Sequence, residues 1–243
     1  VYSPHDKHKP ELGLNSMIDL YTDATPNGLK ISIALEELGL SYQAHRLNLG
    51  GDQMEPIFTQ MNPNQKIPVI KDGNTIVTES GAILFYLAEK TGQLMPSSLT
   101  ERSKVMERLM LQMSGLGPYF GQLLVWAGAW GNEFPQVTSR YQQEVKRLFK
   151  VLDHYLEDSE YMAGNTFSIA DIAFIPWIRM CHVNPVGEML NLAEHQNLSR
   201  WYDLVSQRPS VQRGLLVPDP HDPEVQFKAF VSAVVGLGEL HQA

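Results

Sequence analysis

The 243-residue chain contains few of the features that mark several common protein classes. Its one cysteine, Cys181, permits no intramolecular disulfide, no CxxC redox pair and no cluster of thiolate metal ligands. Any redox chemistry must therefore use a thiol that the protein does not supply. Lys+Arg 19 against Asp+Glu 27 gives a net charge of -8, so the chain as a whole does not attract nucleic acid or an anionic membrane.

Three further features that the sequence lacks exclude other kinds of protein and site. No run of about 18 apolar residues is present, which excludes a membrane-spanning helix. The opening residues lack the basic start and apolar stretch of a secretory signal, so the sequence favours a cytoplasmic location. The eight histidines show neither HExxH nor paired ligand spacing, and the sequence therefore predicts no metal site.

What remains is the composition of a soluble globular protein, with 43% hydrophobic and 19% charged residues. A chain of this length holds one large domain or two small ones. Residues 1–16 are polar and without a period, so we expect a flexible arm or an added flank there. Hydrophobic patterning then separates a first domain, residues 17–96, from a helical one, residues 97–217. Residues 218–243 form a C-terminal extension with the pattern of one helix, Val225–Leu240.

The pattern of the first domain predicts a βαβ unit followed by ββα. Strands are expected at Met17–Tyr21, Tyr42–Leu49, Ile67–Lys71 and Thr75–Thr78, and helices at Leu29–Leu38 and Ala82–Lys90. Thr25 suits the N-cap of the first helix and Gly39 its end. Asp72-Gly73 is a hairpin signal between the last two strands.

Helical spacing runs through the second domain. Helices are expected from Thr100 to Leu116, with a kink near Gly117 and Pro118, and at Tyr141–Leu156, Ile172–Val183 and Leu198–Gln207. Ser168 and Asp171 form a capping-box variant before the markedly apolar third of these helices.

This order of parts, with Ile67-Pro68 opening a strand and Glu79-Ser80-Gly81-Ala82-Ile83 opening a helix, resembles the glutathione transferases. Over residues 17 to about 215 the chain is identified as a member of that superfamily. Thr25-Pro26-Asn27-Gly28, Gly51-Asp52-Gln53, Asn62-Pro63-Asn64-Gln65-Lys66-Ile67-Pro68 and Arg140-Tyr141-Gln142 are similar to the bacterial Nu class of glutathione-dependent disulfide-bond oxidoreductases.

The resemblance implies an α/β plus all-α fold: a thioredoxin-like, glutathione-binding N-terminal domain and an all-helical C-terminal domain, paired as a homodimer. It also implies the residues that bind glutathione, the co-substrate. A cis Pro68 would turn the Ile67 backbone toward the cysteinyl part of glutathione. The helix start at Glu79 and Ser80 would hold its γ-glutamyl end. Asn27, Gln53, Lys66 and Arg140 complete the glutathione-binding set.

The same resemblance assigns catalysis to Thr25 and Asn27, whose hydroxyl and amide would stabilise the glutathione thiolate at the start of a helix. Simpler explanations exist for individual residues. Thr25 and Ser80 are also suitable helix caps, Arg140 has Glu144 four residues on as an ion-pair partner, and Cys181 lies in an apolar helix where it is expected to pack as a small hydrophobe.

Three functions follow as alternatives. The first is glutathione-dependent reduction of a small-molecule or peptide disulfide, with low peroxidase activity and one or two glutathione molecules in each site. The second is conjugation of glutathione to an electrophile. The third is a non-catalytic module that serves dimerisation or regulation. Neither nucleic acid nor membrane is expected as a partner.

Overall fold

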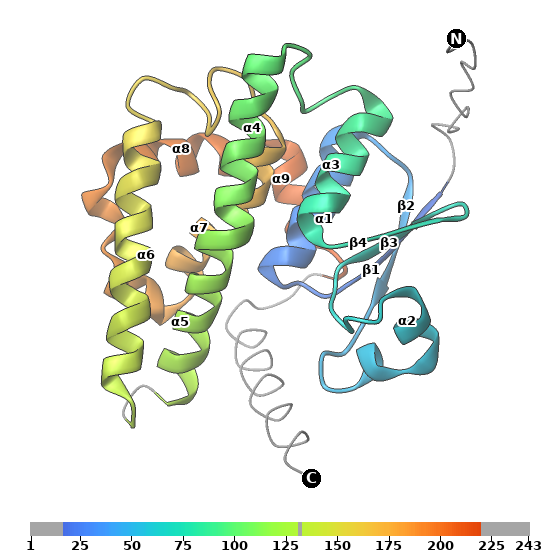
Figure 1. Ribbon diagram of the computed structural model, residues 1–243, viewed down its shortest axis with the longest axis horizontal. Helices are drawn as coiled ribbons and strands as arrows, with labels where there is room; N and C mark the ends of the chain where they lie inside the picture. Colours follow the sequence, from blue (N-terminus) through green and yellow to red (C-terminus); the bar gives the residue numbers. More distant parts are fainter. Residues whose placement is uncertain (1–16, 131–132, 220–243) are drawn as a thin grey trace, which may run out of the picture.

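The computed structural model describes residues 17–130 and 133–219. A small sheet with its helices forms one half of the molecule, and a set of longer helices forms the other (Figure 1). The expected arm at residues 1–16 and the expected helix Val225–Leu240 lie outside the described residues. Within the described part, no helix combines the length and the apolar character needed to span a bilayer.

The sheet has four strands in the order β2-β1-β3-β4. They are β1 (Ile18–Thr22), β2 (Tyr42–Arg46), β3 (Val69–Asp72) and β4 (Thr75–Thr78). Strands β1 and β2 are parallel, whereas β3 is antiparallel to both β1 and β4. The predicted βαβ and ββα units are therefore confirmed, and with them the thioredoxin-like first half.

Several strand and helix ends differ from the expectation. Strand β2 ends at Arg46 rather than Leu49, and β3 begins at Val69, since Pro68 has no N–H to donate to a neighbouring strand. A short helix, α2 (Pro56–Met61), was not predicted. Its signal in the sequence is Pro56, because proline is favoured in the first turn of a helix.

Helices α1 (Pro26–Leu38) and α3 (Ser80–Thr91) lie between the sheet and the helical half, and α2 lies on the opposite side of the sheet (Figure 1). Thr25 caps α1, since its Oγ1 accepts a hydrogen bond from Gly28 N at 3.2 Å. Gly39 ends α1 in the left-handed region at φ 62°. The start of α1 and the start of α3 thus both lie near the junction of the two halves.

The helical half contains α4 (Leu99–Leu111), α5 (Gly117–Ala129), α6 (Pro135–Tyr155), α7 (Ile169–Val183), α8 (Gln196–Ser206) and α9 (Pro209–Gly214). A π-helical turn, Gln112–Leu116, joins α4 to α5 immediately before Gly117 and Pro118, where the kink was predicted. A Cβ atom on Gly117 would lie 2.9 Å from Gln112 Nε2, so a larger residue at 117 would displace the Gln112 side chain. Helix α9 was not predicted, and Pro209 is again its signal.

The two halves share one core, which runs from β1 through α1 to α7. Helix α1 packs against both α7 and α9. Ser32 Oγ donates a hydrogen bond to Gly214 O at 2.7 Å, and the Glu37 carboxylate pairs with Arg208. These contacts fix α1 relative to the helical half, so a site at the start of α1 can use side chains from both halves.

The predicted capping box at α7 is a buried network. The Asp171 carboxylate accepts hydrogen bonds from Met162 N (2.8 Å), Ser168 N (3.0 Å), Ser168 Oγ (3.1 Å) and Trp201 Nε1 (2.8 Å).

We expect Asp171→Ala to lower the free energy of unfolding by at least about 3 kcal/mol, because several buried donors lose a charged acceptor. Urea denaturation checks this, with the exposed Asp203→Ala as a control expected within about 0.5 kcal/mol of wild type. A loss below about 1 kcal/mol for Asp171→Ala would contradict the structural role given to the network.

Candidate functional site

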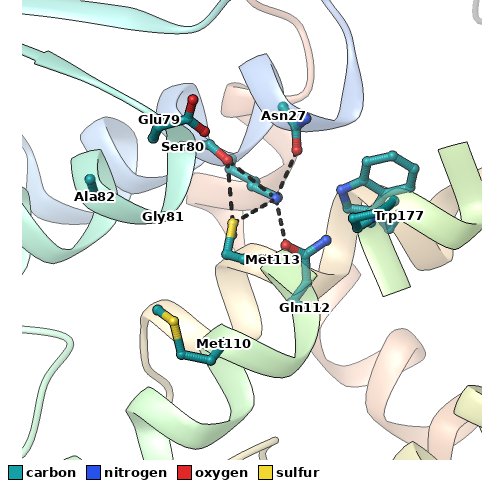
Figure 2. A pocket seen from close by; sticks show the side chains of 12 residues that line it. Asn27, Glu79, Ser80, Gly81, Ala82, Met110, Gln112, Met113 and Trp177 are labelled. Atoms are coloured by element: carbon teal, nitrogen blue, oxygen red, sulfur yellow. Dashed lines mark hydrogen bonds between the residues drawn. The ribbon is translucent and has the colours of Figure 1, made fainter. Parts of the chain in front are cut away.

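Two cavities meet at the starts of α1 and α3. The larger, about 400 Å³, lies between the two halves, and the smaller, about 190 Å³, lies beside the loop that precedes β3. Asn27, Glu79 and Ser80 line both of them. Figure 2 shows the larger cavity, with Asn27 and Ser80 facing Gln112 and Met113. Any ligand that spans both cavities must pass these three shared residues.

The smaller cavity is shaped by the loop of residues 62–68. Buried Asn62 fixes this loop, since its Nδ2 donates to Lys66 O at 2.7 Å and its Oδ1 accepts from Asn64 N at 3.1 Å. The Ile67-Pro68 peptide bond is cis, as the resemblance implied. Lys66, Ile67 and Pro68 line the cavity, and within the described part of the chain the Ile67 backbone has no backbone partner. Its N–H and C=O can therefore pair with an extended peptide.

The start of α3 supplies the polar wall between the cavities. Glu79 precedes the helix with φ 68°, an uncommon value for a residue other than glycine and one that is found at ligand sites. Its exposed carboxylate accepts a hydrogen bond from Asn64 Nδ2 at 3.3 Å. The helix start attracts anions, whereas the Glu79 carboxylate attracts cations. Together they suit a ligand end that carries both an ammonium and a carboxylate.

The start of α1 places the two residues that were predicted to be catalytic. Asn27 lines both cavities. Thr25 is half-buried and lines neither of them, and its Oγ1 is the acceptor of the α1 cap. A hydroxyl that accepts one hydrogen bond still has its O–H to donate. The cap and the predicted contact with a thiolate are therefore compatible.

Sequence reasoning missed Lys30, which lines the larger cavity although its residue is only 1% exposed. Its Nζ donates to Gln112 Oε1 (2.7 Å), Asn27 Oδ1 (2.8 Å) and Ser80 Oγ (3.4 Å). These acceptors come from α1, α3 and the π turn. Lysine is almost never fully buried unless it is paired, so the sequence offered no signal for this burial.

The wall of the larger cavity that belongs to the helical half is mainly apolar. Met110, Met113, Gly117, Pro118 and Trp177 line it. Gln112 Nε2 and Trp177 Nε1 are buried donors with no hydrogen-bond partner in the described structure. Methionine side chains adapt readily to different apolar ligands. This wall therefore suits a second substrate whose shape is less fixed than the first.

Two predicted residues lie elsewhere. Gln53 is 5% exposed and donates to Leu49 O at 2.7 Å, and it lines neither cavity. Arg140, on α6, lines a separate cavity with Tyr119 and Tyr141, and it forms an ion pair with Glu144 at 3.9 Å. The simpler explanation offered for Arg140 is thus what the structure shows, and a role for Gln53 or Arg140 in binding stays a prediction.

Cys181 has no part in the site. It packs against the core in the last turns of α7, where burial raises the pKa of its thiol to about 12. Such a thiol is almost wholly protonated at neutral pH and is a poor nucleophile. Within the described ranges, no group of three His, Cys, Asp or Glu side chains could hold a metal ion. Chemistry at the cavities must then come from the ligands and the polar groups around them.

Comparisons with known protein families match both halves of the chain. Residues 17–89 match the family model described as "Glutathione S-transferase, N-terminal domain". Residues 106–209 match "Glutathione S-transferase, C-terminal domain". Together the two models cover most of the described residues.

A curated relative is the disulfide-bond oxidoreductase YfcG of Escherichia coli, 39% identical over 82% of this chain and 95% of its own. Among solved structures, a glutathione transferase from Burkholderia graminis has two glutathione molecules bound per subunit. It is 41% identical, with a TM-score of 0.81 over 85% of this chain and 90% of its own. A glutathione transferase from Pseudomonas putida has one glutathione disulfide bound per subunit, at 40% identity and a TM-score of 0.79 over 84% and 92% of the two chains.

Proposed function

Because the chain belongs to the glutathione transferase family, we propose that it ionises the thiol of bound glutathione and uses the thiolate to reduce disulfides. The observation that carries the proposal is the junction of the two cavities at Asn27, Glu79 and Ser80. A tripeptide held in the smaller cavity brings its central residue, the cysteinyl one, to the edge of the larger cavity. A disulfide in the larger cavity is then within reach.

The first glutathione uses the groups of the smaller cavity. Its γ-glutamyl ammonium pairs with the Glu79 carboxylate, and its γ-glutamyl carboxylate lies at the start of α3 beside Ser80. The Ile67 backbone pairs with the cysteinyl unit as a strand would. These contacts recognise the backbone and ends of the peptide and leave the thiol to α1.

Ionisation of the thiol decides the rate. A free thiol with a pKa near 8.5 is only about 3% thiolate at pH 7, and lowering that pKa by two units gives about three-quarters. The Thr25 hydroxyl and the Asn27 amide donate hydrogen bonds to the anion, and the start of α1 adds its dipole. No protein cysteine and no general base are required.

The reaction is a double exchange. The glutathione thiolate attacks one sulfur of the substrate disulfide, forms a mixed disulfide and releases the other half of the substrate as a thiolate, which takes up a proton. A second glutathione thiolate then attacks the mixed disulfide, which gives glutathione disulfide and the second substrate thiol. Binding of the second glutathione in the larger cavity is consistent with the two glutathione molecules of the Burkholderia protein.

The relative named as a disulfide-bond oxidoreductase favours this reaction over simple conjugation to an electrophile, which needs the same thiolate. A non-catalytic module is less favoured, because Asn27, Glu79 and Ser80 all border the cavities. Membership of the Nu class, a cytoplasmic location, a homodimer and low peroxidase activity are part of the same proposal. So are the domain limits at residues 96 and 217.

The test is reduction of hydroxyethyl disulfide by glutathione, measured as formation of glutathione disulfide, with wild type and Cys181→Ala. We expect equal turnover from both, because the Cys181 thiol is protonated at neutral pH and Cys181 lines neither cavity. Turnover lost in Cys181→Ala would mean that the protein supplies the nucleophile. Absence of turnover in wild type that still conjugates glutathione to an electrophile would replace the proposal with conjugation.

A further inference from the structure

Lys30 is a buried lysine in the wall of the site. Its Nζ is surrounded by Asn27, Ser80, Gln112 and Met113, and Figure 2 shows the dashed contacts that join these side chains around one point. No carboxylate of the described residues pairs with it at salt-bridge distance. Burying a lysine without an anionic partner is costly, so its place calls for an explanation other than stability.

The hydrogen bonds of Lys30 determine how two amides are turned. An ammonium group donates three hydrogen bonds and accepts none, so only the oxygen of a neighbouring amide can face it. Asn27 therefore presents Oδ1 to Lys30 at 2.8 Å, and Gln112 presents Oε1 at 2.7 Å. The nitrogen of each amide is turned away from the lysine (Figure 2).

This orientation has different consequences for the two amides. Gln112 Nε2 is left buried and without a partner. Asn27 Nδ2 is not among the buried unpaired atoms, and Asn27 lines both cavities. The orientation that costs Gln112 a hydrogen bond leaves the Asn27 N–H groups available to a ligand atom at the junction of the cavities.

We infer that Lys30 is a positioning residue: by holding Asn27 Oδ1 it keeps the Asn27 amide nitrogen aimed at the sulfur of bound glutathione. This inference rests on the proposed function, since it names how the thiolate of that same site is stabilised. An amide that could rotate would present its oxygen to the thiolate for part of the time, and an oxygen repels the anion.

Two opposite effects act on the charge of Lys30. Burial lowers the pKa of Lys30 well below its ordinary value, and the charge of Glu79 opposes that effect. The other groups around Nζ do not ionise near neutral pH: they are Asn27, Ser80, Gln112, Met113 and Trp177. The three oxygen acceptors favour the ammonium form over the neutral amine.

The experiment measures the pKa of glutathione's thiol when bound, from the ultraviolet absorbance of the thiolate against pH. Lys30→Met keeps an unbranched side chain, one atom shorter, and removes the donors and the charge. We expect it to raise the bound thiol pKa by about one pH unit, which means about tenfold less thiolate at any pH below both values. Turnover should fall with it and recover when the pH exceeds the new value. A purely structural role predicts no such recovery.

A double-mutant cycle shows whether Lys30 acts through Asn27. In an Asn27→Ala background, Lys30→Met has no amide to release, so we expect it to change the bound thiol pKa by less than about 0.3. A shift as large as in the wild-type background, or no shift in either, overturns the inference. Lys30→Gln, whose amide still donates hydrogen bonds but carries no charge and is shorter, serves as a milder second variant and should shift the pKa in the same direction.

Lys90→Met is the matched control. Lys90 is also a buried lysine, on α3, but it forms an ion pair with Asp72 and lines neither cavity. We expect it to lower stability and leave the bound thiol pKa unchanged. The thiol titration needs no disulfide substrate, so the two proposals can fail separately. A wild-type protein that lowers the thiol pKa but reduces no disulfide would refute disulfide reduction. The double-mutant cycle would still decide the role of Lys30.

Discussion

Thr25→Ala is expected to reduce turnover about tenfold or more in glutathione-dependent disulfide reduction, with only a modest change in glutathione affinity. In the proposed mechanism the hydroxyl donates to the thiolate, so its loss should raise the thiol pKa and lower the fraction that reacts. In the proposed site, the rest of glutathione is held by the loop of residues 62–68 and by α3, which line the smaller cavity and which the substitution leaves in place. Steady-state kinetics with hydroxyethyl disulfide, beside a binding titration with glutathione, separates the two effects.

The cap at Thr25 requires a control. Since Oγ1 accepts from Gly28 N, Thr25→Ala also removes an N-cap and should cost about 1 kcal/mol of stability. Thr25→Ser keeps both the cap and the hydroxyl donor, and we expect turnover close to wild type. Full activity in Thr25→Ala would remove Thr25 from the catalytic set, and equal losses in both variants would point to packing of the methyl group instead.

Glu79→Ala is expected to weaken glutathione binding about 10- to 100-fold, because a charge-assisted contact with the γ-glutamyl ammonium contributes roughly 1.5–3 kcal/mol. The turnover number at saturating glutathione should change far less. Titration with S-methylglutathione isolates the binding effect, since that ligand has no thiol to ionise.

The control for Glu79 is an exposed glutamate outside both cavities. Glu101, in the first turn of α4, meets that description. Glu101→Ala should bind S-methylglutathione as wild type does, which excludes a general effect of the protein's net charge. Unchanged affinity in Glu79→Ala would mean that the γ-glutamyl end binds elsewhere.

Local signals made much of the fold predictable. Thr25, Pro26 and Gly39 mark the ends of α1 within one short segment, and the structure places that helix at Pro26–Leu38. Ser168 and Asp171 likewise form the predicted capping box at α7. The short helices α2 and α9 were missed because six residues are too few to show a helical period, although each begins with a proline.

In the candidate site, too, residues that belong to continuous motifs were predicted better than residues that are far apart in the chain. Asn27, Lys66, Ile67, Pro68, Glu79 and Ser80 belong to continuous motifs, and all six line the cavities. Arg140 was linked to the site by resemblance alone, and the structure places it in another cavity, between α5 and α6. Whether a residue 60 positions further along the chain than Ser80 reaches the same ligand depends on how the two halves pack.

By itself, the sequence determined that any reactive thiol must come from a ligand, because the chain has a single cysteine, in an apolar segment. It also determined the order of strands and helices and the motifs that form the smaller cavity. Only the tertiary structure decided that Lys30 is buried, since its partners Ser80 and Gln112 lie 50 and 82 residues away. Hydrophobic period and caps act between neighbours in the chain, whereas the wall of a cavity between two domains is made by residues that meet only when the domains pack.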